Sequence, residues 1–211
     1  MPANAPRGYT SYQGRSQWYM NHFGVPQRVD QSYMEDGATR LGVMVFPPSA
    51  NPRRSACTFA TNGMSERRMP CLEQPHDDPR FRLETVAYAS SDAPWVVDLL
   101  LELARYPFVH GSGLSIGHTV PVNAPGQNPW CGYLLARPVW EPEGFNPLAI
   151  DIGLGDDWVF FAQPIGLLDD ELKLAIEIGG PAFGKQLGFA PGAEPSIASR
   201  TLLDLRRGSL L

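Results

Sequence analysis

The sequence predicts an α+β fold in which a mixed, largely antiparallel sheet packs with helices. β-rich runs occur in both halves of the chain, amphipathic helical segments lie between them, and no internal repeat is visible. The 21 glycines and 21 prolines predict many turns and irregular connections. A chain of 211 residues can bury one sizeable core, so we expect a single domain over residues 11–211 after a flexible terminus at residues 1–10.

The N-terminal part of the domain predicts one helix. Aromatic and apolar side chains recur through residues 11–23, Gly24 stops the pattern, and Pro26 keeps it from resuming. Because this helix is rich in aromatic side chains, we expect it to pack on something larger.

Three strands are expected next. Residues 40–46 and 55–61 are β-rich runs separated by a proline-containing turn, which predicts an antiparallel pair. Residues 81–89 alternate in character as a third strand does.

The clearest helix is expected to begin near residues 91–94. Asp92 is the expected cap, Pro94 suits the first turn, and Pro107 is expected to end the helix. Its apolar positions recur at intervals of three and four residues and predict one buried stripe, which consists of Val96, Leu99, Leu100, Leu103 and Tyr106.

The C-terminal half predicts further short elements. The expected strands are residues 132–135, 148–152 and 158–163, with a turn at 155–157, and a last strand at 200–205. The expected helices are residues 167–178 and 182–187, separated by Gly179-Gly180-Pro181. Asp169, Asp170 and Glu171 fall in the first turn of the former, where carboxylates cap a helix.

Charge and composition exclude several classes of protein. The net charge is −5 and the 17 basic residues are scattered, so we expect no nucleic-acid groove. Residues 1–14 lack the layout of a signal peptide, and no run approaches 18 apolar residues, so we expect neither secretion nor a membrane span. The three cysteines fit reduced thiols in the cytoplasm, with Cys57 and Cys131 expected to pack in apolar strands.

The sequence offers no catalytic, metal or cofactor site. The four histidines show none of the close spacings that bring imidazoles together on a metal ion. Gly111-Ser112-Gly113 lacks the spacing of a nucleophile elbow, and Gly153-Leu154-Gly155 lacks the third glycine and following helix of a dinucleotide loop. We therefore expect no catalytic residue, no bound metal and no cofactor.

Several runs together resemble the suppressor-of-fused family over about residues 18–208. They are residues 61–65 (TNGMS), 82–85 (RLET), 101–106 (LELARY) with Phe108, 117–119 (GHT), 161–165 (FAQPI), 170–172 (DEL) and 204–208 (DLRRG). Each run alone is weak, and their order and spacing make the resemblance specific.

The resemblance implies a compact α+β domain that binds another protein and has no catalytic activity. In the animal members of the family a second domain follows, and a short peptide is held between the two, whereas this chain resembles the first domain. Single-domain bacterial relatives look like immunity proteins that neutralise a co-encoded toxin. The expected partner is therefore a protein or peptide, such as a toxin.

The resemblance also implies a binding site. The positions that contact peptide in the animal family correspond here to Tyr106, Leu114 and His118. Tyr106 matches the family's tyrosine, whereas Leu114 replaces an aromatic residue and His118 replaces an aspartate. The glycine-rich segment 106–120 after the helix also suits a loop that presents backbone groups to an extended peptide.

Two alternatives remain open at this point. A hydrolase could use His118 or His110 with an acid brought near by the fold. A self-associating scaffold is suggested by the five tryptophans and the aromatic N-terminal helix.

Overall fold

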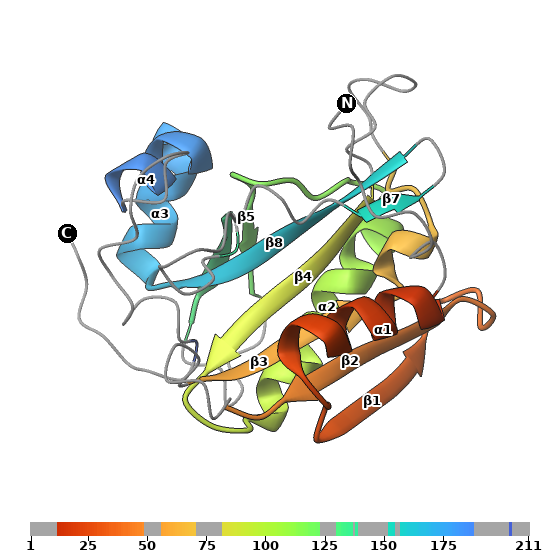
Figure 1. Ribbon diagram of the computed structural model, residues 1–211. Helices are drawn as coiled ribbons and strands as arrows, with labels where there is room; N and C mark the ends of the chain where they lie inside the picture. Colours follow the sequence, from red (N-terminus) through yellow and green to blue (C-terminus); the bar gives the residue numbers. More distant parts are fainter. Residues whose placement is uncertain are drawn as a thin grey trace.

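Within the residues that the computed structural model describes, eight strands form one mixed sheet (Figure 1). The described residues are 12–48, 56–70, 82–122, 130–136, 138, 152–154, 157–187 and 203. The strands are β1 (Arg28–Tyr33), β2 (Arg40–Phe46), β3 (Cys57–Asn62), β4 (Arg82–Ala89), β5 (Thr119–Pro121), β6 (Gly132–Ala136), β7 (Ile152–Leu154) and β8 (Asp157–Leu167). The helices are α1 (Tyr12–Phe23), α2 (Pro94–His110), α3 (Asp169–Ile178), α4 (Gly180–Gln186) and the short 3-10 helix η1 (Met64–Glu66).

The strand order confirms the predicted fold class. It runs β1-β2-β3-β4-β8-β6-β5, with β7 beside β8. All neighbours are antiparallel except β4 and β8, which are parallel. The sheet is therefore mixed and largely antiparallel.

Strand β8 joins the two halves of the sheet by changing partner along its length. Its residues 159–162 pair with β4, and residues 163–167 pair with β6. Proline lacks an amide hydrogen and is rare in central strands. Pro164 is accommodated because it follows the last residue paired with β4. The predicted bounds were wrong at two points: the strand expected to end at 163 continues to Leu167 as β8, and the helix expected to begin at 167 begins at Asp169 as α3.

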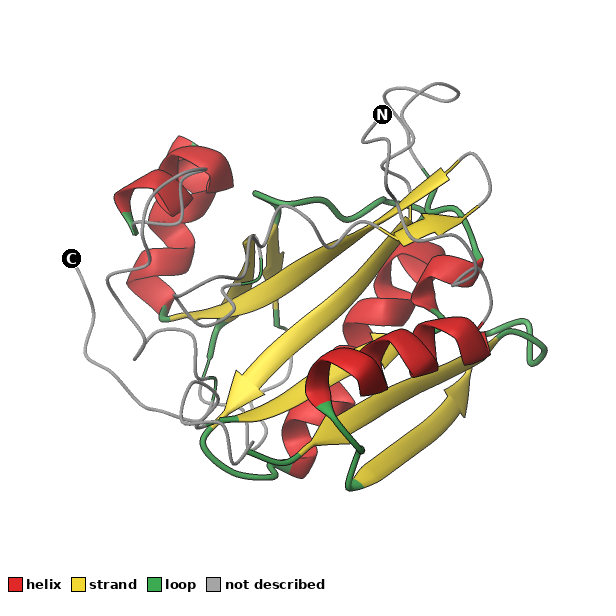
Figure 2. Ribbon diagram, in the orientation of Figure 1, coloured by secondary structure: helices red, strands yellow, loops and turns green. Residues whose placement is uncertain are grey.

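The helices cover both faces of the sheet (Figure 2). Helix α2 buries its predicted apolar stripe against one face, where it packs on Val43, Phe59 and Leu135 in the largest core cluster. Helix α1 covers the other face with Trp18, Tyr19 and Phe23. Helices α3 and α4 pack beside β6 and β8 in a third cluster.

Burial on both faces explains which strands the sequence revealed. Strands β2, β3 and β4 are buried at nearly every position, and their apolar runs predicted them. Strand β1 has the polar sequence RVDQSY with alternating exposure, and β5 has three residues that include a proline. Neither was predicted, because an edge strand needs little apolar surface.

Three local predictions were wrong. Asp92 does not cap α2, whose first turn is preceded by Ala93; its carboxylate instead accepts hydrogen bonds from the side chains of Gln27 and Arg28. Pro107 lies inside α2, which continues to His110 and ends at Gly111 in the left-handed conformation (φ 65°). Cys131 is exposed, whereas Cys57 is buried as expected.

Several predicted segments lie largely or wholly outside the described residues. These are the flexible terminus 1–10, the residues 148–151 of a predicted strand, the turn at 155–156 and the strand 200–205 except Leu203. Leu203 is buried in a turn, where its amide donates to the Tyr88 carbonyl (2.8 Å) and its carbonyl accepts from the Trp130 indole (2.8 Å).

A buried carboxylate fixes the end of the sheet under α1. Glu84 of β4 is fully buried, and its Oε1 accepts from the amides of Gly63 (3.0 Å) and Ser65 (3.1 Å) and from the Ser65 hydroxyl (2.6 Å). Its Oε2 accepts from the Thr61 hydroxyl (2.7 Å). These bonds compensate for the cost of burying a charged group.

Helix α1 is tied to the same carboxylate through Arg15. The Arg15 guanidinium is buried, lies 3.5 Å from Glu84 Oε1, donates to Asn62 Oδ1 (3.0 Å) and pairs with Glu66. In turn, the Asn62 amide donates to the Tyr12 carbonyl at 2.8 Å. The helix is therefore held by ionic and polar contacts as well as by its aromatic face.

We predict that Glu84→Gln lowers the free energy of unfolding by about 3–5 kcal/mol, because it removes the buried charge that faces Arg15 and leaves the guanidinium only its partly exposed partner Glu66. Urea denaturation monitored by circular dichroism measures the change. Glu177→Gln on the exposed face of α3 is the matched control and should change stability by less than about 0.5 kcal/mol. Equal effects of the two substitutions would contradict the structural role of Glu84.

A second carboxylate organises the turn between β1 and β2. Asp36 accepts from the Thr39 hydroxyl (2.6 Å) and from the amides of Thr39 (2.7 Å) and Ala38 (2.9 Å). These bonds, the Thr39 hydroxyl first, lower the pKa of Asp36 from 3.8 to about 2. The charged carboxylate is therefore favoured by the folded turn.

A lowered pKa in the folded state gives stability that is present above the unfolded value and is lost as pH falls through the folded one. We therefore expect the stabilising contribution of Asp36 to disappear between about pH 4 and pH 2. The difference in melting temperature between the wild type and Asp36→Asn, followed from pH 6 to pH 2, should shrink over this window. A constant difference across that range would refute the assignment.

Candidate functional site: a groove beside the edge strand

The structure brings the three predicted site residues to one groove, of about 390 Å³, which we call the β5 groove. It is lined by Tyr106, Ser112, Gly113, Leu114, Gly117, His118, Thr119, Ala175, Ile176, Gly179, Gly180 and Pro181. Tyr106 is partly buried on α2, Leu114 is buried in the loop that follows, and His118 is exposed just before β5.

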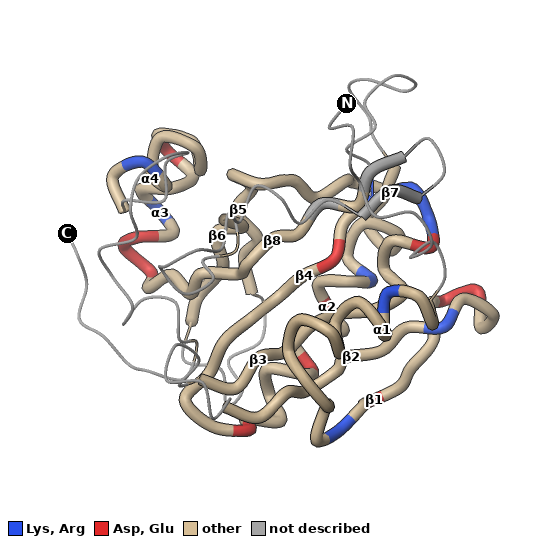
Figure 3. Tube along the Cα trace, viewed as in Figure 1, with Lys and Arg blue, Asp and Glu red and all other residues tan. Residues whose placement is uncertain are grey.

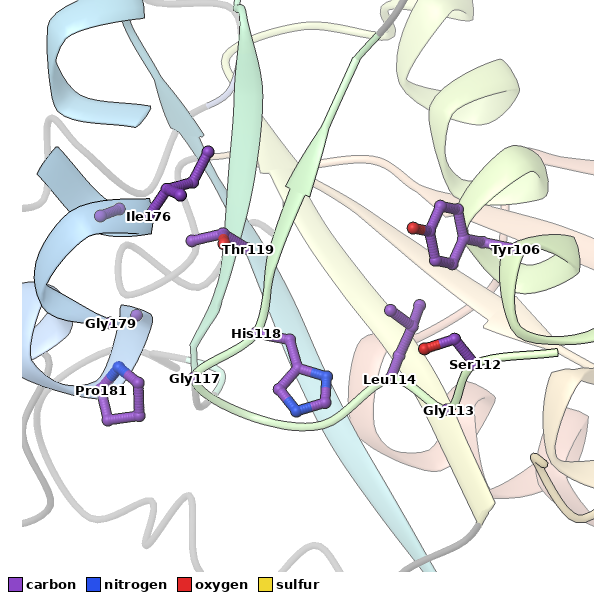
Figure 4. Close-up of a pocket in the computed structure, with 12 residues that line it drawn as sticks. Tyr106, Ser112, Gly113, Leu114, Gly117, His118, Thr119, Ile176, Gly179 and Pro181 are labelled. Carbon is purple, nitrogen blue, oxygen red and sulfur yellow. The ribbon is translucent and has the colours of Figure 1, made fainter. Parts of the chain in front are cut away.

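The two walls of the groove come from distant parts of the chain (Figure 4). Tyr106, Ser112 and Leu114 stand on one side, on α2 and its following loop. Ile176 and Pro181 stand on the other, on α3 and α4, with His118 between the walls. The arrangement requires α2 and the α3–α4 pair to be held against the same end of the sheet.

Backbone hydrogen bonds set the path of the loop between the walls. Gly117 adopts a positive φ of 92°, and its amide donates to the Leu135 carbonyl at 2.7 Å. The His118 carbonyl accepts from the Leu135 amide at 2.9 Å, and its amide donates to the Ser115 carbonyl at 3.0 Å. The backbone position of His118 is therefore set by its anchoring to β6 and to Ser115.

A glycine contact holds the second wall close to this loop. A Cβ placed on Gly180 would lie 1.9 Å from the Gly117 carbonyl oxygen and 3.2 Å from Leu134 Cδ1. Only a residue without a side chain permits this approach. The glycine pair thus fixes the spacing of α4 and the loop.

Strand β5 is the last strand in the sheet order, so one of its edges is open within the described part of the chain. On the side of α2, a second groove of about 370 Å³ adjoins the strand and shares Tyr106 with the first. We call this the α2 groove. Its apolar lining is Leu99, Leu103, Val109, Val120, Pro121, Val122 and Tyr133, and its polar lining is Glu102, Arg105, Tyr106 and His110.

None of the described residues that line the β5 groove is Asp, Glu, Lys or Arg. Charged residues are sparse along β5, β6 and β8 (Figure 3). Among the described lining residues, His118 therefore has no carboxylate beside it. His110, the other histidine of the hydrolase alternative, lines the α2 groove, whose described lining includes Glu102. Within the described residues, no cluster of three or more His, Cys, Asp or Glu side chains could hold a metal ion.

Part of the aromatic surface that suggested the scaffold alternative lies inside the fold. Trp18, Tyr19 and Phe23 of α1 are buried against the sheet, Trp130 is buried in the main core, and Trp95 is partly buried. None of the described helices is long and apolar enough to cross a membrane.

Sequence reasoning missed the second wall of the β5 groove. The break at Gly179-Gly180-Pro181 marked the end of a helix, but nothing in the sequence placed it beside His118. Ile176 gave the one available signal of this wall. It is an apolar side chain on the exposed face of α3, where it is 63% exposed.

We predict that Gly180→Ala destabilises the protein by about 1–3 kcal/mol, because the added methyl group overlaps the Gly117 carbonyl. Gly184→Ala, in the same helix, is the control: its Cβ would meet Leu134 Cδ2 at 3.4 Å, an ordinary contact. The control should be neutral or slightly stabilising, since alanine favours helix. Chemical denaturation checks both variants, and an unchanged Gly180→Ala would refute the close packing.

Solved structures with a similar fold include the following three. One is the crystal structure of the Sufu–Fu complex, at 17% identity and a TM-score of 0.56 over 83% of this chain and 81% of that chain. Another is described as a SUFU homolog from Neisseria gonorrhoeae FA 1090, at 13% identity and a TM-score of 0.52 over 83% of this chain and 86% of that chain. The third is Drosophila Suppressor of Fused, at 17% identity and a TM-score of 0.57 over 87% of this chain and 47% of that chain.

These identities show a shared fold and nothing more specific. A comparison with curated proteins gave no match. The model of the family described as Suppressor of fused protein (SUFU) matches residues 37–200, which is more than half of the chain. The chain therefore belongs to the suppressor-of-fused family.

Proposed function

We propose that this protein is a non-enzymatic binding module that holds an extended segment of another protein along the open edge of β5. The observation that carries the proposal is that this edge is flanked by two grooves, one on each face of the sheet. An extended peptide that adds to a sheet edge gains affinity from backbone hydrogen bonds and specificity from pockets for alternate side chains.

The pairing of β5 with β6 determines which groups face the incoming segment. The Val122 amide donates to the Cys131 carbonyl, and Val120 lies opposite Tyr133. In an antiparallel ladder, residues alternate in the edge to which their backbone groups point. The amide and carbonyl of Thr119 and the carbonyl of Pro121 therefore point away from β6, toward a new strand.

The side chains of such a segment would alternate between the two grooves. Thr119 lines the β5 groove, and the next residue, Val120, lines the α2 groove on the other face. Successive side chains of an added strand also point to opposite faces. The proposal therefore specifies a partner with apolar residues at alternate positions, directed to the α2 groove.

A protein partner is supported by the family. One structure with the same fold is a complex of Sufu with Fu. For this chain we propose a narrower role, as an immunity-type inhibitor that neutralises a co-encoded toxin in the cytoplasm. Its net charge of −5 would speed association with a basic toxin surface.

The variant Ile176→Asp tests the groove without disturbing the core, because Ile176 is exposed. We expect at least a tenfold loss of affinity for the partner, since a charge would be buried unpaired on binding. Val25→Asp makes the same change at an apolar residue that is 79% exposed between α1 and β1, and should bind normally. Affinity capture from the native cell with quantitative mass spectrometry identifies the partner, and titration with that purified partner measures affinity.

Equal partner binding by the two variants would exclude the β5 groove as the binding site. The narrower role is tested by co-expression with the adjacent reading frames. The wild type should restore growth to cells that express a toxic neighbour, and Ile176→Asp should not. Failure of the wild type with every neighbour would exclude the immunity role.

A further inference from the structure

We propose that His118 selects a partner segment that carries a carboxylate, and that acidification strengthens this contact. The inference rests on the proposed capture of an extended segment at β5, and it names the chemistry of the residue that enters the β5 groove. Three features of the groove support it: the fixed backbone of His118, the absence of other charge among the described lining residues, and the alternation of side chains between two grooves.

The His118 ring is placed where an incoming side chain would meet it. The residue is exposed, lies directly before β5, and is seen between Leu114 and Pro181 in the groove (Figure 4). Hydrogen bonds at both its amide and its carbonyl hold the backbone. A side chain on a fixed backbone beside an open strand edge can act in selecting a partner.

Among the described residues, the groove offers no counter-charge to a protonated imidazole. Tyr106 is the one other ionisable side chain in the described lining, and it cannot gain a positive charge. The described charged residues on the surrounding elements lie outside the lining. They are Arg67 and Arg68 after η1, Asp98, Glu102, Arg105 and His110 on α2, Asp169, Asp170, Glu171, Lys173 and Glu177 on α3, and Lys185 on α4. A carboxylate is the complementary group for a cation in such a groove, and a lysine would be repelled.

The sign of the pH dependence follows from the proton on the imidazole. An imidazole gains its positive charge as pH falls through the range from about 8 to 5, where a glutamate side chain is still ionised. Binding of a carboxylate favours the protonated ring. Affinity for an acidic segment should therefore increase from pH 8 to pH 6, whereas affinity for a neutral segment should change little.

Three blocked five-residue peptides test the inference. Each has Thr at both ends, Val at the second and fourth positions for the apolar α2 groove, and Glu, Gln or Lys at the centre for the β5 groove. Titration into isotope-labelled protein, followed by NMR shifts of the amides of Gly117, Thr119 and Gly179, gives each dissociation constant. We expect the Glu peptide to bind about two- to fivefold more tightly than the Gln peptide at pH 6, with Lys weakest, and the ratio to approach one at pH 8.

Two variants separate a specific contact from a general charge effect. His118→Gln should reduce the Glu-to-Gln ratio to about one at pH 6. His22→Gln, which removes an exposed imidazole from α1, should keep the wild-type ratio. A preference for Glu that survives in His118→Gln would overturn the inference.

The outcomes also distinguish this inference from the proposed function. If the Gln peptide shifts the groove resonances and the Glu-to-Gln ratio is one at pH 6, strand capture stands and the role of His118 is refuted. If none of the three peptides shifts these resonances, strand capture at β5 is refuted and the inference falls with it.

Discussion

The contact on which much of the structure depends is the buried carboxylate of Glu84. It accepts four hydrogen bonds from three residues of β3 and the turn after it, and it faces the Arg15 guanidinium of α1. A buried charge is tolerated only when its lone pairs are satisfied and a counter-charge is near. Glu84 therefore fixes both the path of the chain after β3 and the position of α1 on the sheet. Apolar packing alone would not specify either.

The runs that carry the family resemblance fall into two groups in the structure. Residues 61–65 and 82–85 surround the Glu84 carboxylate and serve the fold, whereas residue 106 and residues 117–119 line the β5 groove. A substitution in the first group would affect stability, and under the proposed function one in the second would affect partner binding. His118 belongs to the second group, so under that proposal its substitution changes recognition and leaves the buried interior intact.

The sequence was most informative where burial is strong. Apolar runs predicted β2, β3 and β4, and the three- and four-residue spacing predicted the buried face of α2. The edge strands β1 and β5 have polar or short sequences, so no apolar pattern in the sequence indicated them. Pro107 was wrongly predicted to end α2. A proline inside a helix costs one backbone hydrogen bond, and burial of the same residue can offset that cost. The second groove wall was beyond prediction, since Ile176 and His118 are brought together only by the packing of α3 and α4 beside β6.

The position of β8 has a consequence for synthesis of the protein on the ribosome. The strand lies between β4 and β6, although it follows β4 by about seventy residues in the chain. Until it emerges, the nascent β4 has an unpaired edge, and β5 and β6 have no sheet to join. Exposed edges of this kind pair readily with other chains. The sheet can therefore be completed only after residues 157–167 have been translated.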